Sequence, residues 1–291
     1  MQAPFTDSGS GTGRIATLHR LAEQAVEHLV NDPRVEAAII VGSAAHGIVD
    51  EVSDVDIMIY INEYFTEEEI QDYQEQAKAS GGGIYGANPE HGFGVWPCMN
   101  GVKIDLAFNM IPNMEELIDE VLKNHSLEND FHLIVRGIRN SHVIHGREFI
   151  ETWLNRMNDF PEALAEKMVK ENLRVSPLWI ARDMCAGRNE RVWFPELALE
   201  YLKRNLWVLC GLNRQFYPGK VKGFRHVAEG FAIAPKNYAE RTESVFGTEP
   251  AIATEILRDL VLDVYDLVDT HMPAIETAQA RSWFLTDVVC R

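Results

Sequence analysis

Two short apolar runs, joined by a glycine–serine turn and a polar loop, constrain the fold of this chain more than any other feature. The first run, VEAAIIVGS, ends in Gly42 and Ser43, and the second, DVDIMIYI, begins at Asp54. Short runs of this composition, bounded by turn residues, are typical of buried strands. Because strand side chains alternate between faces, Asp54 and Asp56 are expected on one face, about 7 Å apart along the backbone. Their mutual repulsion predicts a ligand that benefits from the pair.

A third strand, GVKIDLAFNM over residues 101–110, adds another carboxylate. Its apolar residues alternate with Lys103, Asp105 and Ala107, which places Asp105 at the centre of the polar face. An all-oxygen pocket of three carboxylates suits magnesium better than zinc. Magnesium also takes ligands from phosphates, so the pattern predicts a phosphorylated substrate.

The glycine–serine turn fits such a substrate. Gly42 lets the backbone approach a ligand closely, and Ser43 is placed to hydrogen-bond a phosphate oxygen at the start of a following helix. Ser53, directly before Asp54, is as well suited to capping a turn as to binding a ligand.

The rest of the chain divides into two halves by periodicity. In the first half, helices are expected over 15–30, from the Thr66–Glu69 capping box to 79, and over 113–123, with a short strand at 142–146. After residue 160 only helical periodicity is present. We therefore expect an α+β chain: a flexible tail over 1–12, a small mixed β-sheet with flanking helices over 13–157, and an all-helical domain over 158–291.

Composition excludes several classes of protein. A net charge of −17 over 291 residues disfavours stable binding to nucleic acid or to anionic membrane. One segment, residues 173–225, has a net charge of +6. A template-directed or tRNA-adding enzyme would need a broader basic surface, so this segment gives little support to that class. Four scattered cysteines fit a reduced, cytoplasmic protein, and neither a signal sequence nor a membrane-spanning run is expected.

The stretch GSAAHGIVDEVSDVDIMIY resembles the glycine–serine, spacer, Ser-Asp-x-Asp signature of the nucleotidyltransferase superfamily related to DNA polymerase β. Gly42, Ser43, Ser53, Asp54 and Asp56 stand in the matching places, and Asp105 supplies the carboxylate that this family carries on a later strand. His46 stands where many members carry an arginine. A small sheet domain followed by a helical domain is similar to the aminoglycoside and lincosamide adenylyltransferases.

The resemblance implies attack by an acceptor hydroxyl on the α-phosphate of a nucleoside triphosphate, with ATP as the favoured co-substrate. Asp54 and Asp56 would hold one or two Mg²⁺ ions, and Asp105 would be either a third metal ligand or, as we favour, the catalytic base. The helical half would contribute the rest of the site. Its candidates for binding the triphosphate are Arg214, Lys220 and Lys222, and Tyr217 is the candidate for stacking on the adenine or the acceptor.

The acceptor expected from this resemblance is a small molecule with a hydroxyl, and the acidic chain suits a cationic one such as an antibiotic. A second hypothesis is a protein acceptor, as in the antitoxin-type members, although those are short single domains. A third is a nucleotide-binding module without catalysis, which would predict a missing carboxylate or turn residue. Oligomeric state is left open by the sequence.

Overall fold

A computed structural model describes residues 10–287, which form two compact units. The sheet unit comprises the chain up to Glu120 together with Ile134–Asp159, and the helical unit comprises Val121–Leu133 together with the chain from Phe160 onward. The expected tail over 1–12 falls largely outside the described residues, and its last three residues belong to the first helix.

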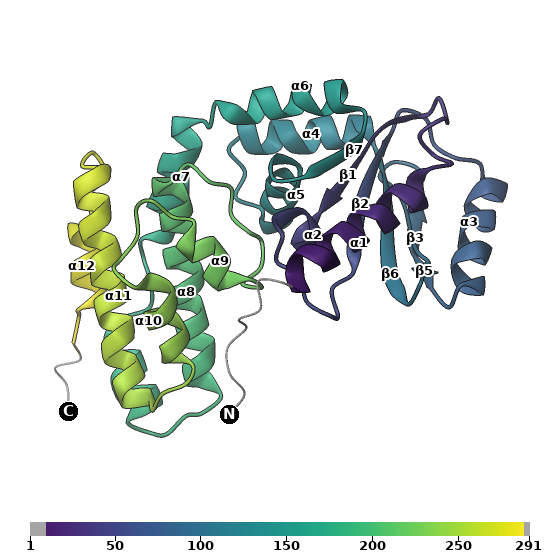
Figure 1. The fold of residues 1–291 in the computed structure, drawn as a ribbon. Coiled ribbons are helices and arrows are strands. Elements are labelled where there is room, and N and C mark those ends of the chain that lie inside the picture. The colour runs from purple at the N-terminus through teal and green to yellow at the C-terminus, as the bar shows by residue number, and fades with distance from the viewer. Residues whose placement is uncertain (1–9, 288–291) are drawn as a thin grey trace. The chain divides into compact units, whose positions relative to one another are not determined.

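The sheet unit contains one mixed sheet, with strand order β3-β4-β6-β2-β1-β7 and with β5 paired to β6 (Figure 1). Strands β2 and β6 are parallel, and the other pairs are antiparallel. The strands are β1 Val35–Val41, β2 Val55–Ile61, β3 Gly83–Asn88, β4 Gly92–Trp96, β5 Cys98–Met99, β6 Val102–Met110 and β7 His142–His145. The predicted α+β class with a small mixed sheet is therefore confirmed.

Helices accompany the sheet on both faces. Their bounds are α1 Ser10–Val26, α2 Gly42–His46, α3 Glu67–Ala79, α4 Ile111–Leu122, α5 Asn129–Arg139 and α6 Arg147–Asn158. On one face, α1 and α3 bury the apolar side chains of β1, β2, β4 and β6 in a single core. On the other face, the ring of Tyr60 in β2 meets the ring of Trp153 in α6 edge-on, 4.8 Å between centroids. Asp56 points to this second face, because it alternates with the core residues Ile57 and Ile59.

Local sequence signals account for most of these elements. In α3, the Thr66 hydroxyl accepts a hydrogen bond from the Glu69 backbone N–H while the Glu69 carboxylate accepts one from the Thr66 N–H, as the capping box predicted. The buried residues of β6 alternate as its sequence indicated. The β3–β4 hairpin was not predicted. Its first strand, GIYGAN, is glycine-rich and exposed, so it lacks the alternating pattern of a half-buried strand.

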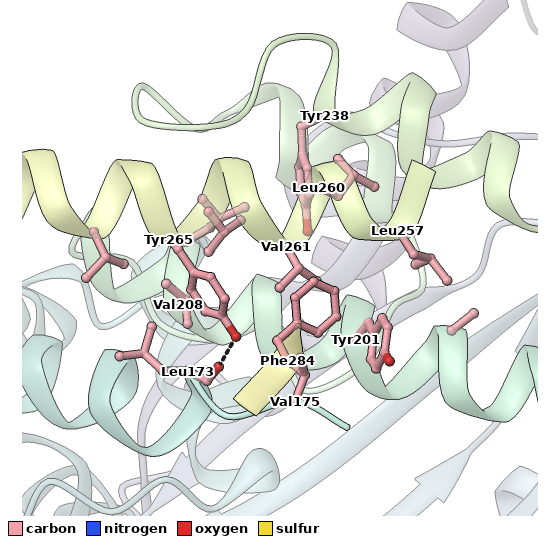
Figure 2. Packing of buried hydrophobic residues seen from close by; sticks show 14 of the residues in the cluster. Leu173, Val175, Tyr201, Val208, Tyr238, Leu257, Leu260, Val261, Tyr265 and Phe284 are labelled. Carbon is pink, nitrogen blue, oxygen red and sulfur yellow. Dashed lines mark hydrogen bonds between the residues drawn. The ribbon is translucent and has the colours of Figure 1, made fainter. Parts of the chain in front are cut away.

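Within residues 160–287 the structure is helical, as the periodicity predicted. The elements are α7 Glu162–Asn172, the π-helix η1 Ile180–Ala186, α8 Trp193–Leu212, α9 Phe224–Glu229, α10 Tyr238–Val245, α11 Pro250–His271 and α12 Ala278–Phe284. Figure 2 shows the core between α8 and α11, where the buried Tyr265 hydroxyl donates a hydrogen bond of 2.8 Å to the Leu173 carbonyl. This hydrogen bond satisfies the one polar atom of the Tyr265 side chain, so the ring can be buried at little cost.

None of the helices between residues 10 and 287 combines the length and the apolar character needed to cross a membrane.

Candidate active site

Strand register brings the three predicted carboxylates together. Strands β2 and β6 run side by side in parallel, with Asp56 directly opposite Asp105, and Asp54 precedes β2 by one residue. One carboxylate oxygen from each of the three lies within 4.8 Å of the others. The sequence predicted the three residues as one cluster, and the parallel pairing of two strands separated by 40 residues of chain is what forms it.

Gly42 lies against this cluster. Strand β1 pairs antiparallel with β2 so that Val41 is opposite Asp56, and Gly42 follows with a positive φ of 68°. A Cβ atom at position 42 would lie 2.6 Å from Asp56 Oδ2, far inside van der Waals contact. Glycine is therefore required here both for the left-handed backbone and for the space that the Asp56 carboxylate occupies.

The carboxylates strongly affect one another electrostatically. The pKa of Asp56 is raised to about 6, first by burial of its carboxylate and then by the negative charges of Asp54 and Asp105. A carboxylate in this position gains from a cation close by. Three carboxylates within this distance form the hard, oxygen-only donor set that Mg²⁺ prefers, so the residues present fit a magnesium ion.

Two further side chains contact Asp105. The Tyr85 hydroxyl donates a hydrogen bond of 2.6 Å to Asp105 Oδ1, and the Lys103 ammonium donates one of 2.7 Å to Asp105 Oδ2. Lys103 Nζ also lies 3.8 Å from Asp54 Oδ2. The alternation of β6 placed Lys103 on the same face as Asp105, but this pattern alone assigned Lys103 no role. Tyr85 was missed because it lies on the unpredicted strand β3.

The two serines take different positions. Ser43 is the second residue of the short helix α2, next to Gly42. Ser53 caps a turn, since its hydroxyl donates to Asp50 Oδ1 at 2.8 Å and accepts from the Asp50 N–H at 2.9 Å. This is the capping role that the sequence allowed for Ser53, and its nucleotide role stays a prediction. His46 is the last residue of α2.

The remaining predicted residues belong to the helical unit. Arg214 forms an ion pair with Glu162, 2.5 Å between Nη2 and Oε1, and has a positive φ of 49°. Lys220 and Lys222 are exposed on the loop after α8. Their predicted contacts with a triphosphate stay predictions.

Tyr217 is placed in the core of the helical unit. The residue is 2% exposed, and its ring stacks on Trp207, with centroids 4.1 Å apart and planes 2° from parallel. Its backbone N–H donates a hydrogen bond of 3.1 Å to Nδ1 of the buried His132. One face of the ring is therefore covered by Trp207, and a stacking role for Tyr217 toward a substrate stays a prediction.

Residues 23–83 match the family described as "Polymerase beta, Nucleotidyltransferase". The matched segment contains the glycine–serine turn with Asp54 and Asp56, and it ends before Asp105. This part of the chain is a nucleotidyltransferase domain, and the protein is accordingly a nucleotidyltransferase. The cluster of Asp54, Asp56 and Asp105 agrees with that assignment.

Two other comparisons were less informative. No curated protein matches the chain. Among solved structures, a nucleotidyltransferase-like protein from Exiguobacterium sibiricum 255-15 aligns at 9% identity, over 91% of this chain and 78% of that chain, with a TM-score of 0.30. A similarity at this level supports no statement about substrate.

Proposed function

We propose that this protein transfers a nucleoside monophosphate, AMP from ATP, to a hydroxyl group of a small molecule in a magnesium-dependent reaction. The observation that supports this most is the convergence of Asp54, Asp56 and Asp105, with oxygen atoms within 4.8 Å, beside a glycine that leaves room for Asp56. The match of residues 23–83 to a nucleotidyltransferase family supports the reaction class.

In this proposal Asp54 and Asp56, with or without Asp105, hold the metal. A bound divalent ion would neutralise charge on the triphosphate oxygens as the α-phosphate is attacked. The backbone at Gly42 and the Ser43 hydroxyl bind phosphate oxygens next to the carboxylates. The acceptor oxygen forms a bond to the α-phosphorus, the bond to the β-phosphate oxygen breaks, and pyrophosphate leaves.

Asp105 accepts the proton of the acceptor hydroxyl in the role that we favour. Both of its oxygens already accept a hydrogen bond, from Tyr85 and from Lys103. Each carboxylate oxygen can accept two, so a site for the proton remains on either oxygen. Tyr85 and Lys103 thereby fix the orientation of the Asp105 carboxylate. A general base needs a fixed orientation in order to accept a proton from a bound hydroxyl.

The acceptor class that we propose is a cationic small molecule, with aminoglycosides and lincosamides as the first candidates. The net charge of −17 and the three carboxylates favour a cation electrostatically. A protein acceptor and a nucleotide-binding module without catalysis are the two alternatives, and the test below distinguishes an antibiotic acceptor from each of them.

The protein is incubated with Mg²⁺ and α-labelled ATP, GTP, CTP or UTP, together with a panel of antibiotics and samples without acceptor. Transfer of label is followed beside release of pyrophosphate, with an Asp54→Asn/Asp56→Asn double variant as the control. Transfer from ATP to one antibiotic, lost in the double variant, is the expected result. Label on protein alone would favour the protein acceptor, and nucleotide binding without transfer to any panel member would contradict the antibiotic assignment. Failure to bind nucleotide would overturn the proposal.

A further inference from the structure

A lysine ammonium group lies among the proposed metal ligands. Lys103 Nζ is 2.7 Å from Asp105 Oδ2 and 3.8 Å from Asp54 Oδ2, so it contacts two of the three carboxylates. Its position follows from the sheet, because Lys103 stands two residues before Asp105 on β6 and therefore points to the same face.

The ammonium is held by more than the carboxylates. It donates a hydrogen bond of 2.6 Å to the Tyr85 hydroxyl, which in turn donates to Asp105 Oδ1. It also lies 5.3 Å from the centroid of the Tyr85 ring and 5.8 Å from that of Trp96, within the range of cation–π attraction. Lys103 thus has four partners on neighbouring segments of one sheet, unlike a surface lysine that moves freely in solvent.

A divalent ion and this ammonium need the same oxygen atoms. Magnesium binds carboxylate oxygens at about 2.1 Å, so an ion shared by Asp54 and Asp105 would lie within a few ångströms of the Lys103 ammonium. Two cations at that separation repel each other strongly in a partly buried site. Either the ammonium moves away or the ion binds more weakly.

We propose that Lys103 is an internal cation that competes with the divalent metal for Asp105 and Asp54, and so sets the metal affinity of the site. This rests on the proposed function, since it takes the carboxylate cluster as the metal site. Metal binding then breaks the Lys103–Asp105 contact and disturbs the hydrogen bonds that Tyr85 makes to both residues. A metal–triphosphate complex is favoured over the metal alone, because the phosphate charge gives the displaced ammonium a new partner.

The test measures binding of Mn²⁺ alone to the full chain, from the loss of the free-ion electron paramagnetic resonance signal. Lys103→Met is expected to bind Mn²⁺ about tenfold more tightly than the wild-type protein, because the competing charge is gone. Lys103→Arg keeps the charge and is expected to stay close to wild type. Lys78→Met, at an exposed position on α3, removes the same charge away from the cluster and serves as the matched control.

The Asp54→Asn variant is expected to lose Mn²⁺ binding, which shows that the ion binds at the carboxylate cluster. With that result, unchanged or weaker Mn²⁺ binding by Lys103→Met would overturn the inference about Lys103. An equal gain in Lys78→Met would also overturn it, since net charge alone would then explain the effect. If Asp54→Asn leaves Mn²⁺ affinity unchanged in both the wild-type and the Lys103→Met protein, the metal site itself is overturned, and with it the proposed function. Circular dichroism of each variant establishes that the fold is retained.

Discussion

At the scale of single residues, the cluster depends on two backbone facts at Gly42: its positive φ of 68° and its contact with Asp56. Gly47, five residues later, has a similar φ of 73°, but a Cβ atom there would meet only Ile15 Cδ1, at 3.6 Å. Comparing substitutions at Gly42 and Gly47 therefore separates the effect of backbone strain from the effect of lost space for the Asp56 carboxylate.

We expect Gly42→Ala and Gly47→Ala each to lose about 1 kcal/mol of stability, since both force alanine into the left-handed region. Only Gly42→Ala should also weaken Mn²⁺ binding, by about tenfold or more, because the new methyl group displaces Asp56. Urea unfolding and isothermal titration calorimetry measure the two effects. Equal Mn²⁺ affinity in both variants would show that the contact with Asp56 does not matter.

The role of Asp105 is a second question at this scale. If Asp105 is the base, Asp105→Asn should lower the rate of transfer by about 10²- to 10⁴-fold while lowering Mn²⁺ affinity less than Asp56→Asn does. If it is a metal ligand, both quantities should fall together. Single-turnover rates at saturating metal, beside Mn²⁺ titration of the same variant, distinguish the two, with Asp56→Asn as the reference for loss of a ligand.

At the scale of elements, β1 and α3 are linked by a charged network. The Arg34 guanidinium, just before β1, forms ion pairs of 2.7 Å with Asp32 and with Glu69 of the α3 capping box, and it lies 3.8 Å over the Phe65 ring. Hydrogen bonds from Arg34 and from Thr66 lower the pKa of Glu69 to about 2, so this carboxylate is charged at neutral pH.

We expect Arg34→Met to lower the free energy of unfolding by about 1–3 kcal/mol, since it removes the charged donor that Asp32 and Glu69 share. Arg258→Met, on the surface of α11, breaks ion pairs with Glu255 and Asp259 that are more exposed. That control should cost no more than about 0.5 kcal/mol. Urea unfolding of both variants checks the difference, and equal losses would mean that the Arg34 network adds nothing beyond a surface ion pair.

The β3–β4 hairpin shows why one element escaped prediction. Strand β3 has glycine at positions 83 and 86, and its exposed Tyr85 ring lies over Gly94 of β4. Periodicity detects strands by burial of every second side chain, and this strand buries almost none. Its pairing with β4 is stabilised by backbone hydrogen bonds between the two strands and by the close packing of side chains over the glycines. Both depend on the partner strand.

At the scale of the whole molecule, the chain passes between the two units more than once. It enters the helical unit at Val121, goes back to the sheet unit at Ile134, and enters the helical unit again at Phe160. Residues 121–133 belong to the helical unit, and His132 from this segment is fully buried there. Its Nδ1 accepts from the Tyr217 N–H, so in the neutral ring Nε2 carries the hydrogen and donates 2.9 Å to the Ser126 carbonyl. Burial lowers the pKa of His132 from 6.5 to about 4.

The unfolded chain therefore binds a proton at His132 between pH 6.5 and 4 that the folded chain does not. The contribution of this group is fully present above pH 6.5 and is lost as the pH falls, by roughly 3 kcal/mol at pH 4. We expect His132→Gln to flatten the pH dependence of unfolding in this window, whatever its effect at neutral pH. His271→Gln, at an exposed position, is the control, and a curve for His132→Gln parallel to the wild-type curve would contradict the assignment.

The sequence by itself determined the parts of this protein that rest on local signals. Strands β1, β2 and β6, the capping box of α3 and the carboxylates of Asp54 and Asp56 all follow from side-chain alternation and from short motifs within a few residues. The candidate site was predictable to that extent, because each of these features is formed by neighbours in the chain.

The tertiary structure alone decided which distant residues meet. The parallel register sets Asp56 beside Asp105, Tyr85 of β3 donates to Asp105, and the Tyr217 N–H donates to His132. Each of these contacts joins residues that are 20 or more positions apart in the chain. Such pairings depend on the energy of the packed sheet and core as a whole, and no local pattern encodes them.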